Sequence, residues 1–323
     1  MGVPGKVTNF PNGVSSFGWV VSPAAYAAQS WGGGPTLWVG NRSGLPAGDG
    51  STPAYPLSAL FGTSGALAKV NNKPGATISI LPGHVESITA STSISALTGT
   101  SATGLNIIGL SVGAQRPLFN WTAAASALLQ NIAGCWIRNC VFNFSSTAAT
   151  VVTAALTVSA ADCGLDGVEI KPATSATQLT TTGITVASGA TKYTLLGVEV
   201  ISETFATNPT DILTTTAAVD KFTMYGCRFL TAVNSTTNGV INLANAPTNV
   251  WIEDCTFDNK KAVSTVAAIA SASTTGAVNF CACIIQAATG GATAFATPGN
   301  LAFGSTRGGV IGKAMIDITP QSG

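Results

Sequence analysis

Two glutamates and an arginine are spaced almost evenly along this sequence, and they are the side chains best suited to chemistry. Glu169 and Glu199 lie 30 residues apart, and Arg228 follows 29 residues later. If each interval is one coil of a repetitive fold, the three residues stand on neighbouring strands about 4.8 Å apart. Two carboxyl groups about 5 Å apart are the arrangement that retaining glycosidases use. Outward glutamates beside an arginine are equally an ordinary solvated ladder, which is the interpretation we favour, and we therefore predict no catalytic residue.

The single histidine, His84, lies two residues before Glu86 in the segment LPGHVES. Residues two apart on a strand share a face, so this pair invites the hypothesis of a Ser-His-acid triad. We assign no G-x-S-x-G elbow that would supply the nucleophile, and we interpret His84 as a structural residue.

Three acids cluster in the segment IEDCTFD, namely Glu253, Asp254 and Asp258. Calcium-dependent cleavage of polysaccharide needs several carboxylates around one ion, with a basic residue nearby. We interpret the segment as a corner followed by a loop. The sequence thus predicts neither a metal site nor a cofactor.

The strongest pattern in the sequence is a six-residue apolar segment that recurs seven times. The fourth residues of these segments are separated by 30, 28, 30, 29, 28 and 28 positions, and we call them the core ladder: Leu110, Cys140, Val168, Val198, Cys227, Cys255 and Cys283. Apolar residues also recur five and three positions before each ladder residue and two positions after it. A repeat of this length indicates a solenoid in which each coil buries its apolar residues against its neighbours.

The residue directly before each ladder position tolerates a bend, as in Asn139, Gly167 and Asp254. Such residues adopt positive φ more readily than others. Two short strands therefore meet at a corner in every coil, and further strand-like patches lie upstream. We predict an all-β fold, a single right-handed parallel β-helix of about 7–9 coils of 28–30 residues.

Four segments follow from this pattern. Residues 1–50 show no coil register and are predicted to be an irregular N-terminal arm or anchor, and 51–75 a capping segment with a short helix. Residues 76–309 form the β-helix, and 310–323 a C-terminal strand or tail that can pair with a neighbouring subunit.

Composition and charge exclude several classes of protein. The chain has 46% hydrophobic and only 8% charged residues, which is unlike a disordered protein. Its net charge is +1 and its basic residues are scattered, so we expect no nucleic-acid partner. We also expect no secretion signal, no membrane association and no disulfide framework, since the seven cysteines lack paired spacing. We predict that they are reduced, that six of them fill inward core positions (Cys135, Cys140, Cys163, Cys227, Cys255 and Cys283), and that Cys281 faces outward.

Several segments together resemble virion proteins of tailed bacteriophages that have a pectate-lyase-like right-handed β-helix. They are TNFPNGVSSFG (8–18), LWVGNRSG (37–44), ISILPGHVESIT (78–89), LNIIGLSVGAQRPLF (105–119) and WIRNCVF (136–142). The resemblance implies a structural part of the particle, such as a head decoration protein or head fibre, that forms a homotrimer. It also implies a virion location and the major capsid protein or other virion proteins as partners.

Three functional hypotheses remain from the sequence: a capsid-bound decoration protein, a polysaccharide-cleaving tail protein, and an adhesin that binds host surface glycan without cutting it. We favour the first, because few acids or aromatic residues are expected on the outer surface. Large apolar residues outside the repeat are typical interface anchors, and we propose as capsid contacts Phe10, Trp19, Trp31 and Trp38.

Overall fold

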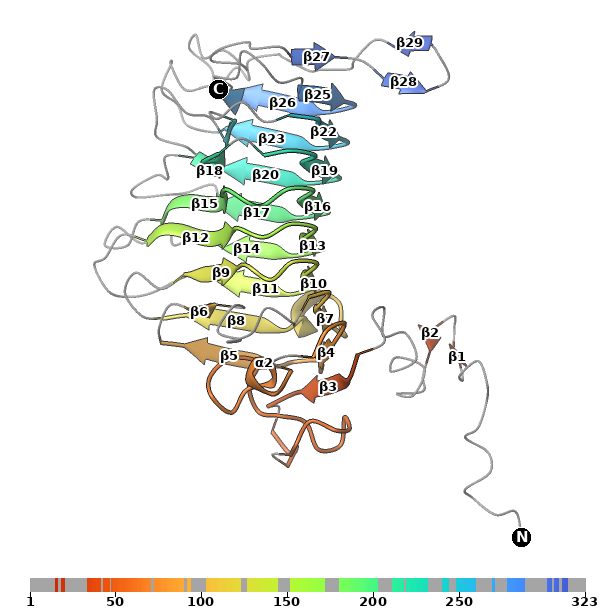
Figure 1. The fold of residues 1–323 in the computed structure, drawn as a ribbon, viewed down its shortest axis with the longest axis vertical. Coiled ribbons are helices and arrows are strands. Elements are labelled where there is room, and N and C mark those ends of the chain that lie inside the picture. The colour runs from red at the N-terminus through yellow and green to blue at the C-terminus, as the bar shows by residue number, and fades with distance from the viewer. Residues whose placement is uncertain are drawn as a thin grey trace.

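The structure is a computed structural model of the 323-residue chain (Figure 1). It describes residues 15–16, 19–20, 34–41, 43–46, 48–70, 73–89, 92–93, 103–122, 127–144, 152–171, 180–202, 211–217, 219–231, 240–243, 248–259, 269–270, 278–287, 301–303, 305–307 and 310–312.

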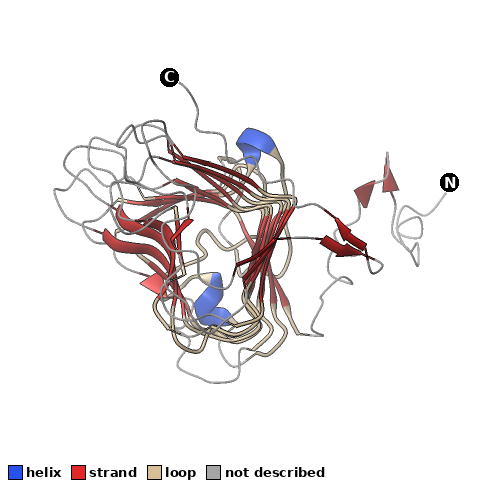
Figure 2. Ribbon diagram, turned by 90° about the horizontal axis from the view of Figure 1, so that it is seen from above, coloured by secondary structure: helices blue, strands red, loops and turns tan. Residues whose placement is uncertain are grey.

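Within these residues the chain winds into three parallel sheets that enclose a common interior, as Figure 2 shows from above. Sheet 1 contains β3 (Thr36–Val39), β4 (Thr77–Ile80), β7 (Asn106–Gly109), β10 (Trp136–Arg138), β13 (Gly164–Asp166), β16 (Thr194–Leu196), β19 (Thr223–Tyr225), β22 (Val250–Glu253), β25 (Val278–Cys281) and β27 (Leu301–Phe303). Sheet 2 contains β5 (Val85–Ile88), β8 (Leu118–Trp121), β11 (Val141–Asn143), β14 (Glu169–Lys171), β17 (Glu199–Ser202), β20 (Arg228–Thr231), β23 (Thr256–Asn259) and β26 (Ile284–Ala287). Sheet 3 contains β6 (Thr92–Ser93), β9 (Leu128–Gln130), β12 (Val152–Val158), β15 (Thr180–Val186), β18 (Asp211–Thr215), β21 (Ile241–Asn242) and β24 (Ile269–Ala270).

The predicted all-β parallel β-helix is confirmed. Each strand pairs in parallel with the equivalent strand one coil away, so beyond the pair of β3 and β4 no two strands that follow each other in sequence pair within these sheets. Sheets 1, 2 and 3 have ten, eight and seven strands in the described residues. The strand count thus differs slightly from one sheet to the next, and that of sheet 1 exceeds the expected 7–9 coils.

The smaller elements lie outside these sheets. The strands β1 (Ser15–Ser16) and β2 (Trp19–Val20) pair antiparallel with each other, as do β28 (Ser305–Arg307) and β29 (Val310–Gly312). Strand β29 of the predicted C-terminal segment thus pairs with β28 of its own chain, and its pairing with a neighbouring subunit stays a prediction. A short helix α2 (Ala66–Lys69) lies in the predicted capping segment, and a 3-10 turn η2 (Gly113–Gln115) precedes β8.

The predicted corner before each ladder residue is present in six of the seven aligned segments. Positive φ angles occur at Asn139, Gly167, Gly197, Gly226, Asp254 and Ala282. At each of the first two, the backbone N–H donates to a carbonyl of the next coil, from Asn139 to Asp166 and from Gly167 to Leu196, both at 2.8 Å. The left-handed conformation therefore turns the chain between sheets 1 and 2 without losing a hydrogen bond between coils.

A second column of left-handed residues precedes sheet 1, and the sequence did not predict it. Its members are Gly75, Gly104, Gly134, Asp162, Lys192, Lys221 and Asn249. The N–H of Lys192 donates to Asp220 of the next coil at 2.8 Å. Lysine has no intrinsic preference for positive φ. The stacked coils impose this conformation.

The prediction that Leu110, the first member of the core ladder, is a core residue was wrong. Leu110 is only partly buried, and Val112, expected two positions later in the core, is 71% exposed. The residue that pairs with Phe142 is Phe119, because η2 and its flanking loop are inserted between β7 and β8. The six other members of the core ladder are buried as predicted: Cys140, Val168, Val198, Cys227, Cys255 and Cys283.

The β-helix begins earlier than the expected boundary at residue 76. Strand β3 pairs in register with β4, so residues from the supposed arm already form the edge of sheet 1. The capping segment follows it, and its apolar residues Leu57, Leu60, Phe61, Leu67 and Val70 are buried. Its helix α2 is four residues long, and much of the cap is irregular chain that covers the core.

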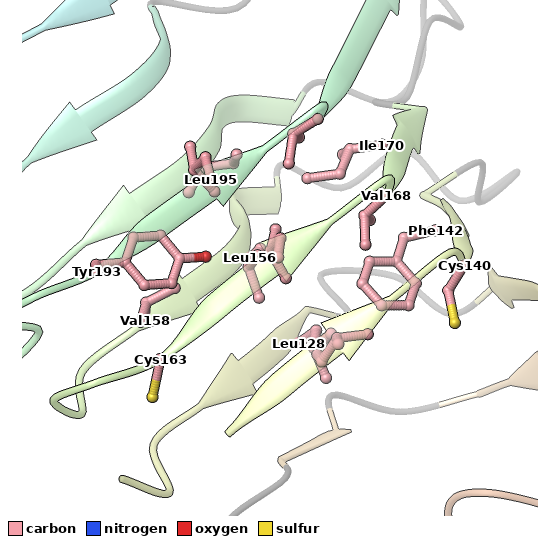
Figure 3. Packing of buried hydrophobic residues seen from close by; sticks show 14 of the residues in the cluster. Leu128, Cys140, Phe142, Leu156, Val158, Cys163, Val168, Ile170, Tyr193 and Leu195 are labelled. Carbon is pink, nitrogen blue, oxygen red and sulfur yellow. The ribbon is translucent and has the colours of Figure 1, made fainter. Parts of the chain in front are cut away.

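Side chains from all three walls fill the interior. Figure 3 shows Phe142 and Ile170 of sheet 2, Leu195 of sheet 1 and Leu128 and Leu156 of sheet 3 within one apolar cluster. Aromatic rings stack between coils, with centroids 4.6 Å apart for Trp121 and Phe144. Burying one large apolar side chain contributes about 1.5–3 kcal/mol, so stacking of the coils dominates the stability.

All seven cysteines are buried and free. Six were predicted to face inward. Cys281 was expected to face outward, but it is buried as well, with only 7% of its surface exposed. The sulfurs pack as small apolar groups.

Candidate functional site

The structure places Glu169, Glu199 and Arg228 side by side on the outer face of sheet 2. Glu169 pairs with Glu199 across β14 and β17, and Glu199 pairs with Arg228 across β17 and β20. The adjacency that the spacing predicted is therefore present.

The two carboxylates are engaged in opposite directions along the solenoid. Glu169 contacts Arg116, which precedes β8 in an earlier coil, and also Lys171 of its own strand, with Oε1 3.2 Å from Nζ. Glu199 instead contacts the following coil, with Oε1 3.1 Å from Nη1 of Arg228. Each carboxylate is thus directed to different cations, and the pairs of Glu169 with Arg116 and of Glu199 with Arg228 form a ladder of ion pairs between coils. Such pairs at a surface contribute little to stability, about 0–1 kcal/mol each.

His84 and Glu86 meet at the N-terminal end of the interior. His84 is fully buried, and its Nε2 lies 3.2 Å from Oε2 of Glu86. Glu86 occupies the inward position that Phe119 fills in the next coil. Its carboxylate accepts hydrogen bonds from the backbone N–H groups of Leu60 at 2.7 Å and Phe61 at 3.0 Å. The pair therefore fastens the capping segment to the first coil, as expected for a structural histidine.

A serine with the spacing of a nucleophile elbow was missed in the sequence. Gly109 to Gly113 reads G-L-S-V-G, which fits the pattern G-x-S-x-G. Ser111 lies in the exposed loop before η2, where its hydroxyl donates to the carbonyl of Gln115. Since Nδ1 of the buried His84 has no hydrogen-bond partner and Nε2 contacts Glu86, these residues do not form a triad.

The acids of the segment 252–258 point to three different places. Glu253 lies in sheet 1 and accepts a hydrogen bond from Nε1 of Trp251 at 3.0 Å. Asp254 is the left-handed corner, as predicted. Asp258 was expected in a loop but lies buried in β23, since the chain enters sheet 2 directly after the corner. Among the residues that the structure describes, no three histidine, cysteine or acidic side chains are grouped to hold a metal ion.

A polar and aromatic cluster on the outer face of sheet 1 contains an ion pair between Arg138 and Asp166 of neighbouring coils. Nε of Arg138 lies 3.5 Å from Oδ2 of Asp166, and Nη1 donates to Oδ1 of Asn106 at 2.7 Å. The guanidinium also lies over the ring of Trp136, 5.0 Å from its centroid. The aromatic residue was missed in the sequence because it stands in a third outward column, four positions before the core ladder, and not in the outward columns of Glu169 or Arg138.

The four residues proposed as capsid contacts lie in different surroundings, and not all of them are described. Phe10 and Trp31 lie outside the described residues, and Trp19 lies in β2, where only the backbone is described. Trp38 was wrong as a contact residue, because it is 5% exposed within β3. Its hydrogen bonds with Gly50 and Leu57 hold it beneath the following loop.

The chain matches no known protein family and no curated protein. Among solved structures it is similar to the crystal structure of pectate lyase Pel9A, with 14% sequence identity and a TM-score of 0.45. The match covers 84% of this chain and 68% of the pectate lyase chain. No helix in the described ranges is long and apolar enough to cross a membrane. The parallel pairing of its three sheets shows that the protein is an all-β parallel solenoid.

Proposed function

We propose that the protein is a structural component of a bacteriophage particle, and specifically a capsid-bound decoration protein of the cement or head-fibre type. The observation that carries this proposal is the ion-pair ladder on sheet 2. Its acids, Glu169 and Glu199, are directed to separate cations and not to a shared substrate position. The sequence segments that resemble phage virion proteins supply the choice of particle.

In this proposal the β-helix is a preformed rod and the N-terminal arm binds the major capsid protein or another virion protein. Stacked coils hold their shape through hydrogen bonds between neighbours and a continuous apolar core. The remaining anchors are Phe10, Trp19 and Trp31. A homotrimer on the virion is the expected assembly.

Immunogold labelling of purified phage particles tests the location. Antibodies raised against residues 34–323 should label heads, and cross-linking mass spectrometry should join the arm to the capsid protein. A chain that lacks residues 1–33 keeps all of sheet 1, because β3 begins at Thr36. It should fold, with an unchanged far-ultraviolet circular dichroism spectrum, and fail to bind heads. Undiminished binding of the truncated chain, or label confined to tails, would contradict the proposal.

A polysaccharide-cleaving tail protein is the second candidate, favoured by the adjacency of Glu169 and Glu199 on neighbouring strands. Its test is incubation with host capsule or lipopolysaccharide, followed by assay of new reducing ends and unsaturated sugars. We expect none. Cleavage that Glu169→Gln abolishes, while Lys171→Gln does not, would replace the decoration role with an enzymatic one.

A further inference from the structure

The outer face of sheet 1 carries three aromatic side chains within a strip of small and polar residues. One outward column reads Trp136, Gly164, Thr194, Thr223 and Trp251 along successive coils. Four coil intervals separate the two tryptophans, or about 19 Å at about 4.8 Å per interval. Tyr225, in the neighbouring outward column, is 50% exposed. We call these six residues the aromatic strip.

Trp136 is fixed in position by its neighbours. A Cβ atom added to Gly164 would lie 2.5 Å from Cζ3 and 2.7 Å from Cη2 of its indole. The ring thus fills the space above Gly164, and only glycine permits this contact. Arg138 lies over the ring and is itself held by Asn106 and Asp166. The ring is partly buried, so its orientation is set before any partner binds.

The other end of the strip is also held rigidly. Nε1 of Trp251 donates to Oε2 of Glu253 at 3.0 Å, and Glu253 pairs in register with Tyr225. The half-exposed phenol of Tyr225 therefore stands beside a fixed indole and a carboxylate. Between the two ends, Thr194 and Thr223 present hydroxyl groups on a surface without large side chains in that column.

This arrangement suits a neutral saccharide chain. Aromatic rings pack against the apolar C–H faces of sugar rings, and a few fixed polar groups orient the hydroxyls. The charges that border the strip are the cations Arg138, Lys192 and Lys221 and the anions Asp162, Asp166, Asp220 and Glu253. Four anions against three cations disfavour a polyanion such as nucleic acid or an acidic polysaccharide. Protein interfaces have cores depleted of charged residues, whereas charged groups flank both tryptophans here.

We propose that the aromatic strip binds a neutral oligosaccharide or polysaccharide that lies along the solenoid axis and spans several coils. Tyr225 and Trp251 pack against the faces of its sugar rings. Trp136, whose ring lies between Gly164 and Arg138, contacts the saccharide with its exposed edge. Asp166, Thr194, Thr223 and Glu253 receive or donate hydrogen bonds at its hydroxyls. No covalent step is involved. The binding is separate from attachment to a capsid, since the strip contains no residue of the arm.

The test is a glycan array that carries neutral and acidic oligosaccharides, probed with the full chain and followed by calorimetric titration of the best neutral hexasaccharide. Trp136→Ala and Trp251→Ala should each weaken binding by about tenfold or more, as loss of an aromatic anchor does. Thr223→Arg should block the strip while both tryptophans remain. Tyr55→Ala is the matched control, because Tyr55 is 58% exposed in the capping segment, and it should leave the affinity unchanged.

Circular dichroism and unfolding midpoints establish that each variant folds. An array with no bound neutral glycan overturns the proposal, as does binding restricted to acidic glycans. So does neutral binding that survives in the folded Trp136→Ala and Thr223→Arg variants.

Discussion

Replacing Glu86 by alanine should release the capping segment from the first coils. The carboxylate accepts the backbone N–H groups of Leu60 and Phe61 at 2.7 and 3.0 Å, and it also contacts the buried His84. Leaving a buried donor without a partner costs about 1–3 kcal/mol, so two orphaned donors cost about 2–6 kcal/mol. In a solenoid each coil contacts only its neighbours, and the loss should fall on residues 56–70 and the adjacent coil.

Hydrogen exchange followed by mass spectrometry measures this effect. Peptides that cover 56–70 should exchange about 30-fold or more faster in Glu86→Ala, the factor that corresponds to about 2 kcal/mol. Peptides that cover 223–231, several coils away, should exchange as in the native protein. Glu86→Gln retains one carbonyl oxygen and the side-chain length, and should show a smaller increase.

Unchanged protection of the Leu60 and Phe61 amides in Glu86→Ala would refute the assignment of Glu86 as the fastener of the cap. Equal acceleration in all peptides would refute the localisation of its effect.

Three further predictions concern the core and the corners. Phe142→Ala should lower the free energy of unfolding by about 3–5 kcal/mol, whereas Val112→Ala, once expected in the same column, should change it by less than about 0.5 kcal/mol; urea unfolding tests both, and equal effects would contradict the inserted loop. Ala282 has a φ of 52°, so Ala282→Gly should stabilise by about 0.5–1 kcal/mol, and Gly167→Ala, at a φ of 60°, should destabilise by about 1 kcal/mol; unfolding midpoints that move the other way would contradict the corner geometry. Burial raises the pKa of Cys140 to about 12 and that of Cys163 to about 11, so both thiols should resist Ellman's reagent at pH about 8 until the protein unfolds. The folded-state pKa values of both thiols lie above the unfolded value of about 8.5. The free energy of unfolding should therefore keep their full contribution below that pH and lose it as the pH rises toward about 11–12. An unfolding midpoint that stays constant from pH about 8 to about 10.5 would argue against this expectation.

The repeat and its first corner could be predicted from sequence because both follow from local preferences. Apolar residues alternate with period two along each strand, and Asn139, Gly167 and Asp254 are types that accept positive φ. The pairing of Glu169 with Glu199 and Arg228 then follows from equal coil lengths. Where the coil length changes internally, as at the inserted turn before β8, the same pattern misassigned Leu110 and Val112.

The sequence by itself thus determined the solenoid, most of its inward columns and the identity of neighbours on its outer faces, since these depend on strand period and spacing. Only the tertiary structure decided that Trp38 is buried and that Lys192 turns a corner. It also decided that Glu86 faces the interior, where its acceptors meet backbone donors of a segment about 25 residues away. Such contacts depend on how an irregular cap folds over the end of the coils, and no local preference encodes that.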